Sequence, residues 1–443
     1  MPRSIAHFSP ARSMLISIIF AIVCGTLLLK LPFCHSIGIS WIDALFTACS
    51  TLCICGLSTI PFASFTTIGQ CVLLILIQIG GLGLVTLTFF LMSFFIKFGY
   101  STQIMAGQLM ELESSKDLKK FIFFIISFTA CIELIGSFLT FWSIHNDYPL
   151  MRSIFLSVFH AVSTFCHAGI SLFPEGMITY KNHYIMLLID CCIMVSAGIG
   201  FITSYEIFNY FKNIRKNKRV YFSLQTKIVG YMTCFLITSS ALLYWMLERH
   251  NTLSEMSPFV AAVNALFNGI AIRGTGFSTV SVDQLQLATL LLIMVMSFIG
   301  SAPGSTGSGI KITTFALFAA VVKAAIVGRT SVSIMGRSIA KDQMFKAIAI
   351  VSLALVWIVI TTFILLITEE GWLFIDILFE SVSAFATLGL STGYTPALSS
   401  VGKLCIITNM IIGRIGALAF VLALYKRHEM PEFSYPEERI IVG

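Results

Sequence analysis

The stretch Thr387-Leu388-Gly389-Leu390-Ser391 closes a short apolar segment, and a longer apolar segment follows it. The same pattern of glycine, a large hydrophobic residue and serine occurs at Gly56-Leu57-Ser58, Gly169-Ile170-Ser171 and Gly276-Phe277-Ser278. The four glycines lie 113, 107 and 113 residues apart (56 to 169, 169 to 276, 276 to 389). This regular spacing indicates an internal repeat in which four loops occupy equivalent places.

The composition is that of an integral membrane protein. Hydrophobic residues make up 57% of the 443 residues and charged residues 11%, against roughly 25% charged residues in a soluble domain. Many windows exceed the ~18 consecutive apolar residues expected of a membrane-spanning helix. The 12 cysteines are scattered and lie mostly in predicted spans, so we expect free thiols. Cys53 and Cys55 alone lack the further ligands of a zinc site.

The positive charges are distributed unevenly between the two sides. Basic residues gather in three connecting segments at 97–120, 212–227 and 323–346, and few occur in the other loops. The positive-inside rule therefore places these segments and both termini in the cytoplasm, and predicts a multi-pass protein of the cell (inner) membrane. The net positive charge is explained by the orientation of the chain in the bilayer, so no nucleic-acid partner is expected.

Each repeat consists of an apolar span, a short segment that ends at the glycine, and a second span. The short segments are too brief to cross ~30 Å of hydrocarbon at ~1.5 Å per residue. The prediction is an all-α membrane protein with eight transmembrane helices and four re-entrant half-helices, arranged with pseudo-fourfold symmetry around a central pore. The expected repeats are 1–98 (pore loop 41–59), 99–220 (pore loop 152–171), 221–335 (pore loop 258–279) and 336–443 (pore loop 373–392, with a short cytoplasmic C-terminal tail). The second spans are expected at 67–97, 184–210, 287 to about 323, and 402–424.

Four such loops can provide a path for a cation. Irregular backbone at membrane depth is tolerated only where protein buries it or water lines it. Glycine freely adopts the dihedrals that aim successive carbonyl groups in one direction, and the C-terminal end of each short helix carries partial negative charge. Glycine and serine are also common where membrane helices pack closely, and this would explain one or two such tripeptides. It does not explain four of them at the same place in a repeat.

Several of these segments resemble the Trk/Ktr/HKT superfamily of potassium transporters, along nearly the whole chain. With no extra pair of spans before the first repeat, the chain is most similar to the Ktr membrane (pore) subunit. The resemblance is carried by Cys53-Ile54-Cys55-Gly56-Leu57, Gln78-Ile79-Gly80-Gly81-Leu82-Gly83, Arg273-Gly274-Thr275-Gly276-Phe277, Gly300-Ser301-Ala302-Pro303-Gly304-Ser305-Thr306-Gly307-Ser308-Gly309-Ile310-Lys311, Ser383-Ala384-Phe385-Ala386-Thr387-Leu388-Gly389-Leu390-Ser391 and Ile412-Gly413-Arg414-Ile415-Gly416.

The resemblance implies a K⁺ selectivity filter made by the residues just before and at each glycine. These are Ile54, Cys55 and Gly56; His167, Ala168 and Gly169; Gly274, Thr275 and Gly276; and Thr387, Leu388 and Gly389. Glycine at all four final positions goes with potassium in this superfamily, whereas serine at the first goes with sodium. His167 departs from the usual asparagine, and we expect a neutral imidazole that braces the loop from behind.

The resemblance also implies a gate in the third repeat. Proline and repeated glycine interrupt the helix at 300–310, so this segment is either a packing kink or a flexible loop that obstructs the ion path. The gate residues are Gly300, Pro303, Gly304, Ser305, Thr306, Gly307, Ser308, Gly309 and Lys311. Lys311 either pairs with a loop carbonyl or extends toward the cytoplasm. Arg414 either links to loop carbonyls or is a fixed positive charge that raises a pore barrier, and both roles are compatible.

Three further intramembrane charges are assigned by their surroundings. Arg273 is expected to hold loop carbonyls or a carboxylate such as Glu380. Glu133 and Asp190 lie in apolar spans, where they are either proton-coupling groups or buried polar struts.

The leading functional prediction is a potassium-uptake pore or transporter that is not an enzyme and holds no organic cofactor. No G-x-x-x-x-G-K-[ST] motif is present, so nucleotide regulation would have to come from another chain. The resemblance implies a homodimer in the lipid bilayer and a cytosolic Rossmann-type nucleotide-binding regulatory subunit. The alternatives are a sodium or Na⁺/H⁺-coupled cation transporter, the potassium-binding subunit of an ATP-driven pump, and a receptor or scaffold with an occluded pore.

Overall fold

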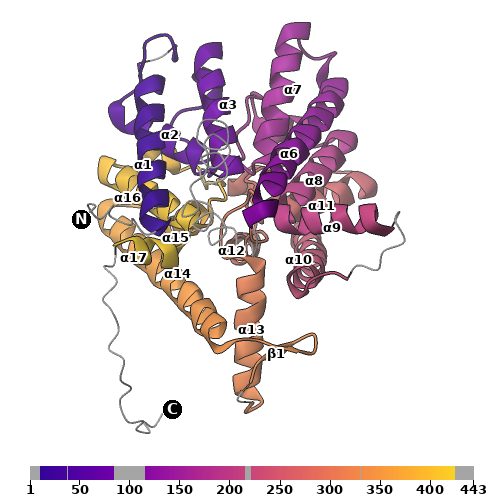
Figure 1. Cartoon of the computed structure of the whole chain (residues 1–443). Coiled ribbons are helices and arrows are strands. Elements are labelled where there is room, and N and C mark those ends of the chain that lie inside the picture. Colours follow the sequence, from indigo (N-terminus) through magenta and orange to yellow (C-terminus); the bar gives the residue numbers. More distant parts are fainter. Residues whose placement is uncertain (1–9, 37, 84–114, 215–220, 330, 425–443) are drawn as a thin grey trace, which may run out of the picture.

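Long and short helices alternate along the chain in the computed structural model, which describes residues 10–36, 38–83, 115–214, 221–329 and 331–424 (Figure 1). The α-helices are α1 (Pro10–Leu29), α2 (Trp41–Leu52), α3 (Thr67–Leu82), α6 (Ser115–Ile144), α7 (Leu150–Phe165), α8 (Tyr184–Gly198), α9 (Phe201–Ile214), α10 (Leu224–Glu248), α11 (Pro258–Ala271), α12 (Leu287–Phe298), α13 (Ile312–Ile326), α14 (Lys341–Thr368), α15 (Phe374–Ala386), α16 (Ser400–Ile415) and α17 (Ala417–Leu424). A two-stranded antiparallel hairpin, β1 (Ser333–Ile334) and β2 (Arg337–Ser338), joins α13 to α14. Short 3₁₀ turns follow the four loops at η1 (Phe62–Ser64), η2 (Gly176–Tyr180), η3 (Val282–Gln284) and η4 (Thr395–Ala397).

The short helices lie where the sequence predicts them. Helix α2 has the expected bounds, with Ser40 accepting a hydrogen bond from the Asp43 N–H at its start. Helix α11 begins at Pro258, whose missing N–H costs nothing at the first helical position. Each of the four short helices carries one fully buried phenylalanine, nine or ten residues before its glycine: Phe46, Phe159, Phe267 and Phe379. These rings anchor the short helices among the longer ones.

The second helix of several units is broken rather than continuous. The expected span 184–210 is divided into α8 and α9, which meet at 96° around Gly200. The expected span 402–424 is divided into α16 and α17, which meet at 100° around Gly416. Both glycines have positive φ (89° and 92°), which an L-residue rarely adopts and which ends a helix. The apolar segments predicted as spans at 184–210 and 402–424 are therefore bent at these glycines, which we did not predict.

Within the described ranges, three helices are long and apolar enough to cross a membrane: α6 from Lys120, α10 and α14. Counting each bent pair as one span gives up to five. Helices α1, α3, α12 and α13 are apolar but shorter. The end of the expected 67–97 span and the C-terminal tail from residue 425 lie outside the described residues, so the number of eight spans stays a prediction.

The elements pack in a closed circuit. In sequence order α2 contacts α3, α3 contacts α7, α7 contacts α8 and α8 contacts α11. The circuit continues from α11 through α10, α12 and α15 to α16, which packs against α2. Figure 1 shows the result, with α16 (yellow) beside α1 and α2 (indigo). The first and last parts of the described chain are therefore neighbours.

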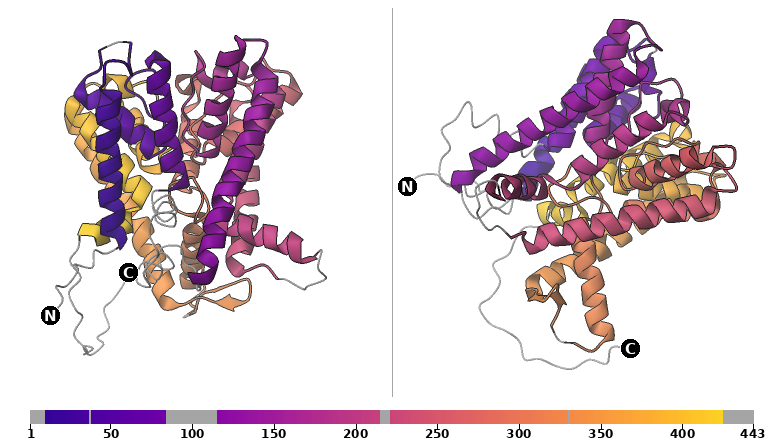
Figure 2. Two further views of the ribbon diagram at one scale, coloured as in Figure 1. Left: turned by 45° about the horizontal axis from the view of Figure 1, so that its top comes forward. Right: turned by 90° about the vertical axis from the view of Figure 1, so that its right-hand side faces the viewer.

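The outer faces of the long helices are apolar. On α6, Phe123, Leu134, Phe138 and Trp142 are exposed, and a similar row runs along α14. Contiguous exposed apolar surface of this kind is uncommon on soluble monomers and is the surface that lipid covers. The hairpin and α13 extend beyond the lower end of the helices, away from the loops that precede α3 and α8 (Figure 2).

Candidate functional site

The four glycine loops touch one another in a ring. A methyl group placed on Gly56 would lie 2.6 Å from the carbonyl oxygen of Ala168 in the next loop. The same relation holds around the circuit: Gly169 faces the carbonyl oxygen of Thr275, Gly276 that of Leu388, and Gly389 that of Cys55. Each glycine is thus packed against the main chain of the following loop, and the fourth loop returns to the first.

The backbone follows the same unusual path in all four loops. The glycines have φ between 64° and 89°, and the residues two positions earlier also have positive φ. Those residues are Ile54 (52°), His167 (58°), Gly274 (125°) and Thr387 (48°). Positive φ is a genuine outlier for the β-branched Ile54 and Thr387. Strain of this kind persists only where the surroundings fix it, and it clusters at functional sites.

The amide groups of the loops point back into the short helices. The Cys55 N–H donates to the Ser50 carbonyl, Ala168 to Ser163 and Leu388 to Ser383, each at 2.8 Å. In the third loop the Thr275 N–H donates to the Ala271 carbonyl at 2.9 Å. The N–H groups of these four residues are therefore engaged by the short helices and are not available to the ring.

Side chains behind the loops fix the chain that follows each glycine. The hydroxyls of Ser163 and Ser383 donate to the carbonyls of Ile170 and Leu390 (2.7 and 2.6 Å). In the third loop Asn268 takes this role, because its side chain donates to Thr279 Oγ1 and accepts from the Thr279 N–H. We did not predict these residues. The signal was present in the repeat itself, since serine stands six residues before the glycine at Ser50, Ser163 and Ser383.

The carbonyl oxygens of the twelve predicted filter residues have no hydrogen-bond partner in the described part of the chain, and the four glycines that end the loops are half-buried. Cys55, Ala168 and Leu388 are at most 1% exposed. Carbonyl groups inside folded proteins nearly always have a partner, so a cluster without protein partners is suited to bind water or a cation.

The predicted gate loop lies against the second of these loops. Thr306 donates its hydroxyl hydrogen to the Phe165 carbonyl (2.9 Å), and its oxygen lies 2.8 Å from Nδ1 of His167. Because the only hydroxyl hydrogen is already used, Thr306 accepts from Nδ1–H. The expected bracing role of His167 therefore takes the form of a contact to the gate loop.

Arg414 also holds the same loop. Its guanidinium donates to the carbonyl of Thr306 and to the hydroxyl of Ser308, both at 2.8 Å, and to the carbonyl of Gly80 at the end of α3. Lys311 donates to the Gly307 carbonyl at 2.6 Å, which selects the first of its two expected roles. The loop is thus crosslinked to α16 and α3 by charge-assisted hydrogen bonds.

Arg273 also reaches the gate loop, with a 3.5 Å contact to the Gly300 carbonyl. The alternative partner Glu380 is occupied by the hydroxyls of Ser391 and Thr395. Pro303, Gly304 and Lys311 border a cavity of about 660 Å³, whose other walls come mainly from α10, α13 and α14.

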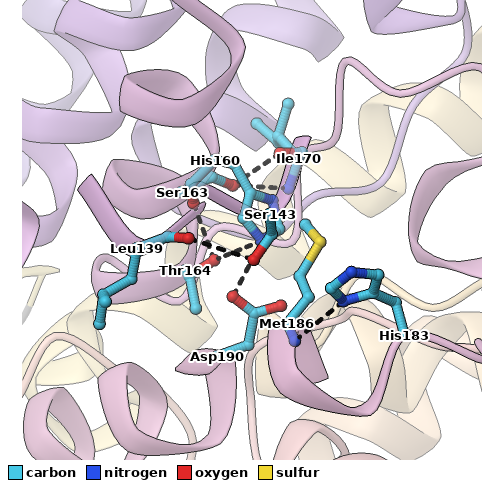
Figure 3. A network of polar contacts seen from close by, with 9 residues as sticks. All are labelled: Leu139, Ser143, His160, Ser163, Thr164, Ile170, His183, Met186 and Asp190. Atoms are coloured by element: carbon cyan, nitrogen blue, oxygen red, sulfur yellow. Dashed lines mark hydrogen bonds and ion pairs between the residues drawn. The ribbon is translucent and has the colours of Figure 1, made fainter. Parts of the chain in front are cut away.

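The two intramembrane acids have different partners. Glu133 on α6 accepts a hydrogen bond from Gln78 on α3 at 3.2 Å, as a polar strut would. Asp190 on α8 lies 3.0 Å from Nε2 of His160 on α7 (Figure 3). We did not predict His160, because nothing local in the sequence joins residues 30 positions apart on two helices.

Known proteins are similar to this chain over nearly its whole length. The model of the TrkH family, described as cation transport protein, matches residues 5–435. The chain is 32% identical over 442 residues to the Ktr system potassium uptake protein B of Bacillus subtilis, covering 99% of this chain and 97% of that protein. It is 30% identical over 450 residues to the potassium/sodium uptake protein NtpJ of Enterococcus hirae, covering 99% and 98%.

The fold has a solved counterpart as well. The crystal structure of the potassium transporter TrkH from Vibrio parahaemolyticus superimposes with a TM-score of 0.73 at 19% identity, over 96% of this chain and 86% of that one. At this identity the likeness concerns the fold alone. Taken together with the match of the family model over nearly the entire length, it leads to one conclusion: the chain belongs to the TrkH family of cation transport proteins.

Proposed function

We propose that this chain carries K⁺ into the cytoplasm through a selectivity filter formed by its four glycine loops. The proposal rests on the ring of loops in which each glycine packs against the main chain of the neighbouring loop, and in which the carbonyl oxygens have no hydrogen-bond partner among the described residues. Carbonyl oxygens that replace an ion's hydration shell, at several sites of moderate affinity, are what conduction requires. The process is transport without a catalytic step, and K⁺ is the substrate.

Potassium is favoured over sodium by two considerations. Glycine stands at the last position of all four loops, as in potassium-selective members of the superfamily that the sequence resembles. Relatives from Bacillus subtilis and Vibrio alginolyticus, with 32% and 31% identity, are named potassium uptake proteins. The name of the Enterococcus hirae relative includes sodium, which makes a sodium transporter the second candidate.

The loop at 300–310 is proposed as the gate. Its bonds to His167 and Arg414 hold it beside the second filter loop, so ion flow requires some of them to break. Hydrogen bonds of this kind contribute about 1 kcal/mol each, and more when charged, so a small group of them is enough to hold a closed state that a regulator can shift. The adjoining cavity provides space for the loop to move.

The rest of the assembly follows from the resemblance and from the charge pattern. We infer four span–pore-helix–span repeats with pseudo-fourfold symmetry in the inner membrane, with both termini in the cytoplasm. We also infer that the chain forms a homodimer and that a cytosolic Rossmann-type nucleotide-binding subunit binds to it. The basic end formed by α13, the hairpin and the start of α14 is the surface on which such a partner would dock.

Rubidium uptake tests the proposal directly. Cells that lack their own potassium uptake are made to express this chain, with and without the cytosolic partner, and Rb⁺ influx is measured at several external Na⁺ concentrations. Saturable Rb⁺ influx that Na⁺ does not inhibit supports a potassium pore. Influx of Na⁺ in preference to Rb⁺ would favour the second candidate, and absence of any flux in reconstituted vesicles would leave only a non-conducting role.

A further inference from the structure

Glu380 carries a buried carboxyl group that belongs to neither the proposed filter nor the proposed gate. It is 0% exposed and stands on α15, directly after the anchoring ring of Phe379. Its Oε1 accepts a hydrogen bond from the hydroxyl of Ser391, and its Oε2 accepts one from the hydroxyl of Thr395 at 2.9 Å. Ser391 lies two residues after Gly389, so these bonds act on the chain as it leaves the fourth loop.

The two contacts of Glu380 do not depend on the charge of its carboxyl group. An ionised carboxylate accepts from both hydroxyls, whereas a neutral acid accepts at one oxygen and donates at the other. A serine or threonine hydroxyl can take either part, because it has one hydrogen and two lone pairs. The side chain therefore holds the same two residues in either protonation state.

The fourth loop is held by a second side chain of the same helix. The Ser383 hydroxyl donates to the Leu390 carbonyl at 2.6 Å, and its oxygen accepts from the Gly389 N–H at 3.2 Å. Ser383 stands three residues after Glu380, so both side chains lie on the same face of α15. The chain that leaves the filter is therefore fixed first by Ser383 and then by Glu380.

The fourth loop requires such support because its backbone is strained. Thr387 has a φ of 48°, which is rare for a β-branched residue. A conformation of this kind persists only where the surroundings hold it. Loss of a bond behind the loop would therefore let its main chain relax.

The residue after the anchoring phenylalanine is buried and polar in all four repeats: Thr47, His160, Asn268 and Glu380. In the third repeat, Asn268 bonds to the hydroxyl and to the N–H of Thr279, three residues after the glycine. In the second, His160 bonds to a carboxylate of α8 instead. In the first, the hydroxyl of Thr47 has no partner among the described residues. The third and fourth repeats thus use this position to hold the chain that follows the glycine.

The first loop depends on the fourth for its position. Its hydroxyls at the two equivalent places, on Thr47 and Ser50, are buried without a partner in the described structure. The loop packs instead against the fourth, because a methyl group on Gly389 would collide with the carbonyl oxygen of Cys55. A shift of the fourth loop would change this contact, so the bonds of Glu380 support the main chain of two neighbouring loops.

We propose that Glu380 is a positioning residue that determines the preference for K⁺ over Na⁺. Selectivity depends on the number and spacing of the carbonyl oxygens around the ion, and such a site must be held to within about 0.5 Å by the bonds behind it. Without Glu380, Ser391 and Thr395 lose their shared acceptor, and the first and fourth loops can close around a smaller ion. The inference rests on the proposed function, since the ion is the one in the proposed filter.

The test measures Rb⁺ influx in cells that express the full-length chain. The KM for Rb⁺ and the inhibition constant of Na⁺ are determined separately from the maximal rate. We expect Glu380→Ala to raise the KM for Rb⁺ about tenfold and to make Na⁺ a stronger inhibitor, because removal of a group that orients a metal ligand typically lowers affinity by about tenfold or more. A loss of folded protein alone would lower the maximal rate and leave both constants unchanged.

Glu380→Gln is the conservative variant that separates position from charge. The glutamine side chain has the same length, can accept from Ser391 at its carbonyl oxygen and can donate to the hydroxyl of Thr395 through its amide. Both constants should therefore stay near the wild-type values. If Glu380→Gln is as impaired as Glu380→Ala, the hydrogen bonds are not what sets the selectivity, and the inference is wrong.

Glu248→Ala is the matched control. Glu248, at the end of α10, is also 0% exposed and accepts hydrogen bonds from Thr252 and from Thr289 near the start of α12. Its contacts thus hold helix ends and no filter residue in the described structure. Loss of stability should lower the maximal rate of this variant, with the wild-type KM for Rb⁺ and the wild-type inhibition by Na⁺. A rise in its KM equal to that of Glu380→Ala would overturn the inference.

Thr395→Val keeps the test decisive if Glu380→Ala does not fold. It removes one of the two bonds from the other side and preserves the shape of the side chain, so the KM for Rb⁺ should rise about fivefold, the effect of one hydrogen bond. Unchanged constants in Thr395→Val, or in folded Glu380→Ala, would overturn the inference and leave the filter proposal intact. Wild-type chain without saturable Rb⁺ influx would overturn the filter proposal itself.

Discussion

Gly56 has no space for a side chain and a φ of 88°. A serine there would place Cβ 2.6 Å from the Ala168 carbonyl oxygen, so the first and second loops would have to separate. We expect Gly56→Ser to lower the preference for K⁺ over Na⁺ about tenfold, which corresponds to about 1.4 kcal/mol of differential binding. The measurement is the ratio of Rb⁺ to Na⁺ uptake in cells.

Gly38→Ser is the matched control for this change. No atom lies within 4 Å of a Cβ added at Gly38, and its φ is ordinary. Its selectivity should equal that of the wild type. If Gly56→Ser also keeps the wild-type ratio, the first loop does not select the ion and the filter assignment fails there.

Thr306 is the residue through which the gate loop meets the second filter loop. Thr306→Val keeps the shape of the side chain but removes the hydroxyl that contacts both His167 and Phe165. Two lost hydrogen bonds of about 1 kcal/mol each should raise the open fraction by roughly thirtyfold. Rb⁺ influx in the absence of the cytosolic partner should increase accordingly.

Thr408→Val controls for the loss of a threonine hydroxyl. Thr408 is exposed on α16 and bonds only to the Leu404 carbonyl of its own helix. Rb⁺ influx through the Thr408→Val variant should equal that of the wild type. Lower influx in Thr306→Val would mean that the loop supports conduction instead of obstructing it.

At the scale of elements, the short helices could be predicted because their signals are local. The bounds of α2 follow from Ser40 at its start and from the glycine loop after its end. The bends at Gly200 and Gly416 were missed, because two or three glycines in a long apolar run are also common in straight membrane helices. Only in the third unit does the sequence itself predict the helix break, because a proline and four glycines lie between Gly300 and Gly309.

The contacts between elements were less predictable. The four filter segments follow from the repeat, whereas the partners of His167 and Arg414 on the gate loop are 139 and 108 residues away. For Lys311, Arg273 and Glu133 the sequence left alternatives open, since a buried charge requires a partner but does not identify it. His160 was missed for the same reason: only the packing of α7 against α8 brings it to Asp190.

The two bends predict different responses to alanine. At Gly416 a Cβ meets no atom within 4 Å, so Gly416→Ala incurs only the strain of φ 92°, about 1 kcal/mol. At Gly200 the Cβ would also lie 2.6 Å from the Pro303 carbonyl oxygen of the gate loop. We expect Gly200→Ala to lower the melting temperature of the purified protein by more than the roughly 2 °C expected for Gly416→Ala.

Gly230→Ala is the control for these two bends. Gly230 is exposed inside α10 with nothing within 4 Å, so alanine should be neutral or slightly stabilising there. Equal melting temperatures for Gly200→Ala and Gly416→Ala would show that the contact between Gly200 and the gate loop is not tight.

At the scale of the whole molecule, the basic residues at the two ends can be compared. Near the filter loops, Lys403 is paired with Asp43 and Arg152 is bonded to Gln70, whereas Lys181 is exposed. At the opposite end, Arg337 and Lys341 are exposed on the hairpin and at the start of α14. By the positive-inside rule, segments that carry exposed basic residues stay on the cytoplasmic side. The rule therefore assigns the end with the hairpin to the cytoplasm and the end with the filter loops to the outside.

This separation predicts which positions a reagent reaches from outside the cell. Lys181 follows η2 near the filter loops and Arg337 lies on the hairpin, and both are exposed. A membrane-impermeant maleimide added to intact cells should label Lys181→Cys and not Arg337→Cys, whereas both should react after the cells are opened. The chain without an added cysteine is the control, because its exposed thiols Cys71, Cys131, Cys192 and Cys234 lie on apolar helices, where lipid prevents thiolate formation. Labelling of Arg337→Cys in intact cells would reverse the orientation, and the inward direction of K⁺ uptake would lose its support.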